Sequence, residues 1–173
     1  MIVKKLTKYD AEHYRQIRLE ALDKNPDSFG TTYQEEVIKT IEQFRDRIPV
    51  NNNFILGCFE DKNLIAIVAF NQESRIKLRH KAYISSMYVQ QEYREKGIGK
   101  LLLNELIERA KAINEVEILL LDIVKNNVLA KALYLSLGFQ IYGTEKRAYK
   151  YKNQYFDLEF MCLQIKESAM KSY

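Results

Sequence analysis

The sequence predicts an α/β fold in which a mixed sheet of six to seven strands is flanked by about four helices. An apolar run at 82–89 leads into residues 98–110, where apolar side chains recur at helical spacing. Residues 118–124 are apolar except for one acidic side chain, as in a central strand covered on both faces. Residues 54–59 and 64–70 flank a polar tetrapeptide and predict a β-hairpin.

The N-terminal third predicts one strand followed by two helices. Residues 2–6 read as the strand, and the N-cap candidates at 7–10 precede a helix that begins at Ala11. The turn residues at 25–28, which include Pro26, end that helix. A second helix is expected over residues 33–48, where Pro49 and three asparagines close it.

The remaining two thirds predict the hairpin, a strand and long helix, then a strand, a short helix and a final strand pair. The long helix is expected to reach Ala112, and the short one spans 126–137 and ends at Gly138. The last two strands are expected at 139–142 and 155–164, and residues from 167 on look frayed. The predicted order is therefore β-α-α-β-β-β-α-β-α-β-β.

Bulk composition fits one globular domain over residues 1–173. Hydrophobic residues make up 47% of the chain and charged residues 29%, and the net charge of +4 suits a small anionic ligand rather than nucleic acid. The N-terminus lacks the apolar segment of a signal peptide, and the longest apolar run, 64–70, is too short for a membrane span. We therefore expect a cytoplasmic protein without a membrane partner. Cys58 and Cys162 are isolated and predict reduced thiols, and no Cys/His cluster predicts a metal site.

Two glycines, Gly97 and Gly99, stand where the strand at 82–89 passes into the long helix. The first turn of a helix has backbone N–H groups without partners and a partial positive charge, and glycine lets a large anion approach that backbone. Arg94, Lys96 and Lys100 add formal positive charge. The segment therefore predicts a pyrophosphate cradle, although an ordinary strand-to-helix turn would use the same residues.

The glycine spacing excludes two common phosphate loops. A Walker loop needs four residues between its glycines, and a dinucleotide fingerprint needs a third glycine where this chain has Leu102. The pattern Arg94-x-x-Gly97-x-Gly99 instead resembles the acyl-CoA motif of the GNAT superfamily of N-acetyltransferases.

Further motifs in the same order extend the resemblance over most of the chain. An Asn-x-x-Ala-x-x-x-Tyr pattern followed by Gly-Phe is present as Asn127, Ala130, Tyr134, Gly138 and Phe139. A late Tyr-x-Asp-x-x-x-Met pattern spans 155–161, and the segment 18–33 is similar to that of a common bacterial GNAT variant. The predicted element order is also that of the GNAT fold.

The resemblance implies an acetyl-CoA-dependent N-acetyltransferase that acts on a small-molecule amine, a peptide N-terminus or a lysine by direct transfer in a ternary complex. It also implies that the strand at 82–89 bulges and separates from the strand at 118–124 to admit the pantetheine arm. Met87 and Val89 would contribute backbone groups, and Asn127 would hydrogen-bond the arm. The residues expected to contact acetyl-CoA are Met87, Tyr88, Val89, Arg94, Glu95, Lys96, Gly97, Ile98, Gly99, Lys100, Asn127, Ala130 and Tyr134.

Tyr134 is the expected general acid, because a phenol with a pKa of ~10 can protonate a departing thiolate of comparable basicity. The alternative is that it only packs its helix on the sheet. No general base is identified: Ser85, Ser86, Glu35, Glu36 and His80 are weak candidates, and a water chain or an already neutral amine would need none. Phe29, Tyr33 and Glu35 are expected on the acceptor side.

Two other functions compete with an enzyme. One is an acyl-CoA-binding regulatory module without turnover, which the lack of an obvious base favours slightly. The other is nucleic-acid binding through Arg75, Lys77, Arg79 and Lys81, which would share one face of an extended segment, with help from 147–152. Solvated surface is the simpler interpretation of those charges, so no nucleic-acid partner is predicted. A homodimer is left open because many relatives pair, and the acceptor and acyl-chain selectivity are not determined.

Overall fold

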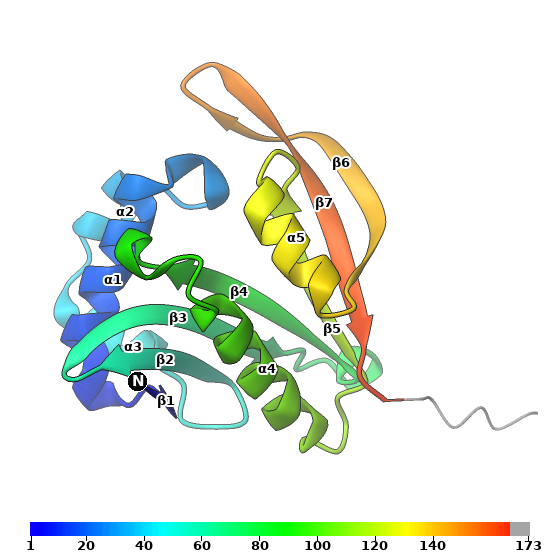
Figure 1. Ribbon diagram of the computed structural model, residues 1–173, viewed down its shortest axis with the longest axis horizontal. Helices are drawn as coiled ribbons and strands as arrows, with labels where there is room; N and C mark the ends of the chain where they lie inside the picture. The colour runs from blue at the N-terminus through cyan, green and yellow to red at the C-terminus, as the bar shows by residue number, and fades with distance from the viewer. Residues whose placement is uncertain (167–173) are drawn as a thin grey trace, which may run out of the picture.

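A seven-stranded mixed sheet forms the centre of the computed structural model, which describes residues 1–166 (Figure 1). The strand order is β1-β2-β3-β4-β5-β7-β6, and only the β4–β5 pair is parallel. The predicted α/β class and mixed sheet are thus confirmed, while the end predicted to fray, 167–173, lies outside the described residues. The strands are β1 Ile2–Lys5, β2 Phe54–Glu60, β3 Asn63–Gln72, β4 Lys81–Val89, β5 Ile118–Val124, β6 Gln140–Tyr151 and β7 Gln154–Gln164.

Helices cover both faces of the sheet (Figure 1). The α-helices are α1 Ala11–Lys24, α2 Tyr33–Val37, α3 Ile41–Arg47, α4 Ile98–Lys111 and α5 Val128–Ser136. The predicted apolar stripe of α4 packs with Tyr134 of α5 into one core, and α1 and α3 pack against the opposite face in a second. Alternation along β2, β3 and β4 sends side chains into both cores, which fixes the register of these strands.

The prediction of a single helix over residues 33–48 is wrong, because the chain forms two short helices there. Thr40 starts a second helix: its Oγ1 accepts the Gln43 N–H at 3.3 Å, and Gln43 Oε1 accepts the Thr40 N–H at 2.9 Å. This reciprocal capping repeats the Thr32–Glu35 arrangement that begins α2. Two capping boxes eight residues apart are therefore a better guide here than apolar periodicity.

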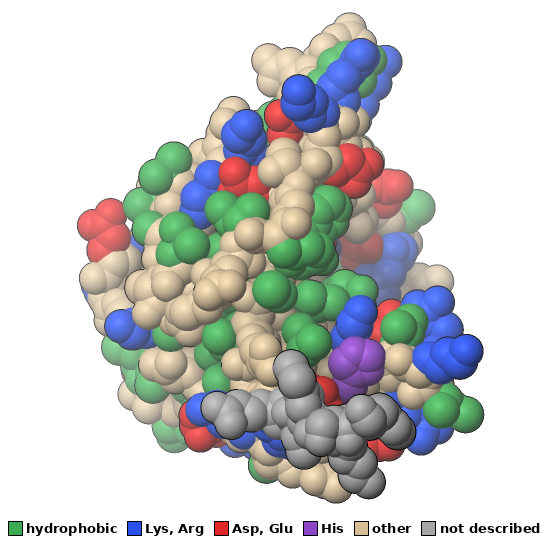
Figure 2. All heavy atoms as spheres, turned by 90° about the vertical axis from the view of Figure 1, so that its right-hand side faces the viewer, with side chains coloured by type: hydrophobic (Ala, Val, Ile, Leu, Met, Phe, Trp, Pro, Cys, Tyr) green, Lys and Arg blue, Asp and Glu red, His purple; other side chains and the backbone are tan. Residues whose placement is uncertain are grey.

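The strand expected at 139–142 is also too short, since β6 continues to Tyr151. It is an edge strand whose residues are mostly exposed and polar, so it lacks the apolar pattern that marks buried strands. The β6–β7 hairpin extends beyond the body of the molecule, and Lys and Arg side chains gather over its tip (Figures 1 and 2). A register shift between Glu145 and Tyr149 bends the strand, and Arg147 within it has φ +56°.

The basic segment 75–81 is not one extended face. Residues Ile76–Leu78 form a 3₁₀ helix, Arg75 contacts Glu73 at 3.1 Å, and Arg79 contacts Glu115 at 3.5 Å. The expected alignment of four cations is therefore wrong, because the chain turns between them.

Cys58 is buried and Cys162 is half-buried, and both are free thiols. Within residues 1–166, no three or more His, Cys, Asp or Glu side chains are grouped so that they could hold a metal ion. No helix in the same part of the chain is long and apolar enough to cross a membrane.

Candidate active site

Strands β4 and β5 separate halfway along their length. They pair only from Lys81 with Ile118 to Tyr83 with Leu120, and then diverge. Near the separation β4 also bulges, because Ser86 has φ +54° and two β4 residues oppose one residue of β3. The bulge and the separation that the family resemblance implied are both present. The backbone of β4 beyond Tyr83 is therefore not hydrogen-bonded to β5.

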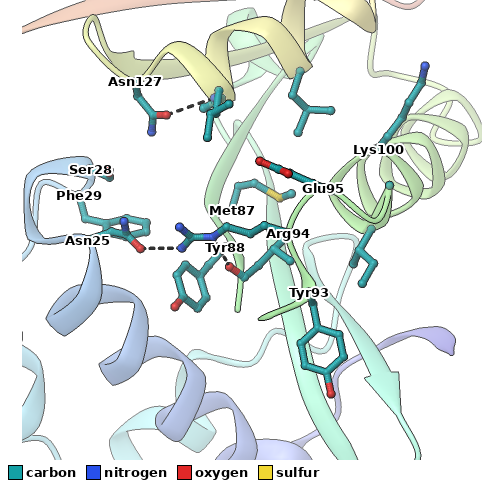
Figure 3. Close-up of a pocket in the computed structure, with 17 residues that line it drawn as sticks. Asn25, Ser28, Phe29, Met87, Tyr88, Tyr93, Arg94, Glu95, Lys100 and Asn127 are labelled. Carbon is teal, nitrogen blue, oxygen red and sulfur yellow. Dashed lines mark hydrogen bonds between the residues drawn. The ribbon is translucent and has the colours of Figure 1, made fainter. Parts of the chain in front are cut away.

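A cavity of about 370 Å³ opens beside this separation (Figure 3). Its walls are the end of β4, the β4–α4 loop, the start of α5 and the α1–α2 connection. Eleven of the thirteen predicted acetyl-CoA contacts line it; Lys96 and Tyr134 do not. The eleven are Met87, Tyr88, Val89, Arg94, Glu95, Gly97, Ile98, Gly99, Lys100, Asn127 and Ala130.

The start of α4 presents free backbone donors to this cavity. The first intrahelical bond runs from Leu101 N–H to Gly97 O at 2.9 Å, so the N–H groups of residues 98–100 precede it without partners in the helix. Gly97 has φ +78°, and a Cβ built there would meet no atom within 4 Å. A Cβ on Gly99 would instead lie 3.1 Å from Leu133 Cδ2. Gly97 therefore keeps the cradle open, whereas Gly99 allows α4, α5 and β4 to pack closely.

Replacing Gly97 by alanine is expected to weaken coenzyme A binding by on the order of tenfold, the equivalent of one lost charge-assisted contact. The added methyl would enter the open cradle, and the left-handed backbone should lower the free energy of unfolding by about 1 kcal/mol. Isothermal titration with coenzyme A and thermal unfolding measure the two effects. Gly143→Ala is the control, because its new Cβ would lie 3.7 Å from Phe160. Equal affinities for the two variants would contradict the cradle.

The basic residues around the cradle are arranged differently from one another. Arg94 Nε donates to Val89 O at 3.0 Å and its Nη2 donates to Asn25 Oδ1 at 2.8 Å, so the guanidinium ties β4 to the end of α1 (Figure 3). Lys96 lies 5.2 Å from the centre of the Tyr93 ring. Lys100 extends away from Arg94, and Glu95 adds a carboxylate at the same opening (Figure 3).

Asn127 is the N-cap of α5 and faces Arg94 across the cavity (Figure 3). Its Oδ1 accepts the Ala130 N–H at 3.2 Å. Because the oxygen is used for capping, the side-chain NH₂ is left to donate into the cavity.

Tyr134 is not among the residues that line the cavity. Its side chain is 5% exposed and packs edge to face on Phe139, with ring centres 5.6 Å apart. Burial raises the pKa of its hydroxyl, and the nearby Asp122 carboxylate raises it further. The phenol therefore stays protonated at neutral pH, but its raised pKa makes it a weaker acid than the matched pKa of ~10 on which the expected role rests.

Of the three residues expected on the acceptor side, one lines the cavity and two do not. Phe29 lines the cavity, but Tyr33 and Glu35 belong to the first turn of α2 and do not. The Glu35 carboxylate accepts the N–H and hydroxyl of Thr32, and these bonds lower its pKa. Glu36 is buried in ion pairs with Lys39 at 2.6 Å and Arg47 at 2.5 Å. Both carboxylates therefore stabilise the helices and are already bonded within the protein.

The other candidate bases are also placed unfavourably. The Ser85 hydroxyl accepts a hydrogen bond from Asn71 Nδ2 at 3.2 Å, and Ser86 is the bulge residue itself. His80 precedes β4 at the end remote from the cavity, where its carbonyl accepts the N–H groups of Glu117 and Ile118.

Asp122 is the carboxylate that the sequence analysis did not assign. It lies on β5 beyond the part paired with β4, its side chain is exposed, and the Tyr149 hydroxyl donates to its Oδ2 at 3.4 Å. Although Asp122 is reached by solvent, desolvation by the protein atoms around its carboxyl raises its pKa, and the Tyr149 hydrogen bond partly offsets that rise. The available signal was that Asp122 is the one charged residue in an otherwise apolar central strand.

Comparisons with known proteins agree with this geometry. A family model described as the acetyltransferase (GNAT) domain matches residues 3–160. The L-methionine sulfoximine/L-methionine sulfone acetyltransferase of Pseudomonas aeruginosa is 35% identical over 80 residues, which cover 46% of this chain and 46% of that relative. The match therefore spans about half the length of the curated relative.

Solved structures share the fold over nearly the whole chain. The GNAT-family acetyltransferase from Streptococcus pneumoniae superposes with a TM-score of 0.84 at 23% identity, covering 95% of this chain and 99% of that one. The yncA structure from Salmonella typhimurium, with its cofactor acetyl-CoA, has a TM-score of 0.81 at 21% identity and covers 99% of this chain and 98% of its own. At these identities the two structures establish the fold.

Proposed function

Because this chain belongs to the GNAT family of acetyltransferases, we propose that it transfers an acetyl group from acetyl-CoA to a primary amine in a ternary complex. The observation that supports amine chemistry best is the exposed Asp122 carboxylate on β5, just beyond the part of β5 that pairs with β4. Asp122 is not among the residues that line the cavity at the start of α4. An exposed carboxylate can bind an ammonium group and accept its proton.

The reaction needs a base for the amine and an acid for the thiol. The amine nitrogen forms a bond to the thioester carbonyl carbon and the carbon–sulfur bond breaks. Asp122 accepts a proton from the ammonium group and passes it to solvent, and Tyr134 protonates the departing sulfur. Tyr134 regains its proton from the nitrogen that becomes the amide, so one ammonium and one thioester give one amide, one thiol and one free proton.

Several features of the cavity support acetyl-CoA as the second substrate, which would supply the activated acetyl group. Unpaired N–H groups at 98–100 and the open position at Gly97 suit its pyrophosphate. The amide NH₂ of Asn127 and the free edge of β4 suit the pantetheine arm. In the yncA structure acetyl-CoA is named as the cofactor of that protein.

An acceptor screen tests this function. Purified protein is incubated with acetyl-CoA and amines of four kinds: methionine sulfoximine and methionine sulfone, other free amino acids, peptides with free N-termini, and lysine peptides with blocked termini. The first kind is included because the partial relative from Pseudomonas aeruginosa is named for those two acceptors. We expect free thiol to be released together with a gain of one acetyl group by mass spectrometry. Coenzyme A binding without thiol release for any amine would support a regulatory module instead.

A further inference from the structure

The Tyr149 side chain reaches from β6 to β5 and to the connection between α1 and α2. It belongs to β6, and its hydroxyl lies 3.4 Å from Asp122 Oδ2 on β5. The same hydroxyl would lie 3.1 Å from a Cβ on Gly30, in the α1–α2 connection. One phenol therefore meets segments from three distant parts of the sequence, and the absence of a side chain on Gly30 makes room for it.

The fold holds Tyr149 in this place by means of the β6 bulge. Asp157 of β7 accepts the Arg147 N–H at 2.9 Å through Oδ1, and Arg147 has φ +56°. The backbone carbonyl of Asp157 accepts the Lys125 N–H at 2.9 Å, which joins the bulge to the end of β5. Burial and the Asp122 charge raise the pKa of Tyr149 to about 12, so its hydroxyl remains a donor at neutral pH.

We propose that Tyr149 and Gly30 form a bridge over the acceptor side that positions the Asp122 carboxylate and limits the acceptor to a slim, unbranched amine. This inference rests on the proposed function of Asp122. Tyr149 is a positioning residue in this scheme, because it acts on the amine through Asp122, and Gly30 determines how closely the two walls approach.

The geometry makes the bridge sensitive to single atoms. The 3.4 Å bond is already long for an O–H···O contact, so a small shift of the phenol breaks it. An alanine methyl at residue 30 would force such a shift, because a 3.1 Å contact is tighter than normal packing. Within residues 1–166, the titratable groups that interact with Asp122 are the phenols of Tyr134 from α5 and of Tyr142 and Tyr149 from β6. All three phenols are neutral at neutral pH, so the substitution of Tyr149 acts on Asp122 through the loss of its hydrogen bond.

The first test titrates Asp122 directly by ¹³C NMR of its side-chain carboxyl, assigned through Asp122→Asn. Losing a donor to the charged form raises the pKa of a carboxyl. We therefore expect Tyr149→Phe and Gly30→Ala each to raise the pKa of Asp122 by about half a unit to one unit, the size expected for one long hydrogen bond. Tyr155→Phe in the same hairpin and Gly143→Ala in the same strand should leave it unchanged. An unchanged Asp122 titration in Tyr149→Phe overturns the bridge, whether or not any amine is acetylated.

The second test uses kinetics with an acceptor found by the screen. The acid limb of the kcat/KM profile should move to higher pH in Tyr149→Phe. Adding Gly30→Ala should move this limb less in the Tyr149→Phe background than in the wild type, because the hydroxyl oxygen that the new methyl would meet is gone. Tyr149→Ala should raise kcat/KM for a branched amine relative to an unbranched one by several-fold. Additive effects of Tyr149→Phe and Gly30→Ala on the acid limb would overturn the positioning of Asp122. An unchanged ratio of kcat/KM for branched over unbranched amines in Tyr149→Ala would overturn the size limit. If no amine in the screen is acetylated but the pKa of Asp122 rises as expected in Tyr149→Phe and Gly30→Ala, the proposed function is overturned and the bridge is not.

Discussion

Replacing Tyr134 by phenylalanine is expected to lower kcat by about 10²- to 10⁴-fold, the usual contribution of a positioned general acid. The affinity for coenzyme A should change little, because Tyr134 is not among the residues that line the cavity and phenylalanine keeps its packing on Phe139. Steady-state kinetics and isothermal titration with coenzyme A measure the two quantities separately.

The fold should tolerate this change. Phenylalanine keeps the edge-to-face packing on Phe139, and within residues 1–166 the Tyr134 hydroxyl makes no hydrogen bond whose partner would be left unpaired. The free energy of unfolding should therefore fall by less than about 1 kcal/mol. Tyr14→Phe is a matched control, since Tyr14 is equally buried but packs in the other core against Phe44. Equal kcat values for the two variants would return Tyr134 to a packing role.

Asp122→Asn is expected to reduce kcat/KM for the amine by about 10²- to 10⁴-fold near neutral pH. Without the carboxylate only an amine that has already lost its proton can react, so the rate of the variant should rise with pH until the amine itself is neutral. The deficit should therefore be largest near neutrality and shrink at alkaline pH. A pH profile of kcat/KM for both proteins measures this. A variant with wild-type activity at pH 7 would contradict the role of Asp122 as the base.

The same substitution should not cost stability. The pKa of Asp122 is raised above its usual value of 3.8 in the folded state, so the folded chain holds that proton more tightly than the unfolded chain. Stability contributed by this group is therefore present below pH 3.8 and is lost as the pH rises through the folded-state pKa. Asparagine avoids that loss, so the midpoint of thermal unfolding at pH 7 should be equal or higher in Asp122→Asn. A lower midpoint would show that the carboxylate is structural.

Local patterns were enough to predict α4, the β2–β3 hairpin and β5. In each, a repeated spacing of apolar side chains coincides with burial against one face or both. The glycine turn that begins α4 could be predicted for the same reason, because its glycines and the strand end before them are neighbours in the chain. The lining of the cavity by Gly97, Gly99 and Asn127 then followed from the spacing of the family motifs.

Features that depend on distant partners could not be predicted. By sequence, Asp122 belongs to a buried central strand. It is exposed because it lies beyond the last residue of β5 that pairs with β4, and that separation is not visible in the local pattern. Tyr149 and Gly30 lie in different thirds of the sequence, and the bulge that brings them together depends on Asp157. Glu35 looked available for chemistry, but its local capping bonds with Thr32 use it.

Arg94 joins the wall of the cavity to the connection between α1 and α2 through a single side chain. It donates to Val89 in the wall of the cavity and to Asn25 at the start of the connection that carries Gly30. A donor molecule that draws the guanidinium toward its phosphates competes with Asn25, and thereby alters how firmly that connection is held. Thermodynamic linkage then requires the occupancy of either site to change the affinity of the other by the same factor. We therefore expect the binding of each reactant to change the affinity of the protein for the other.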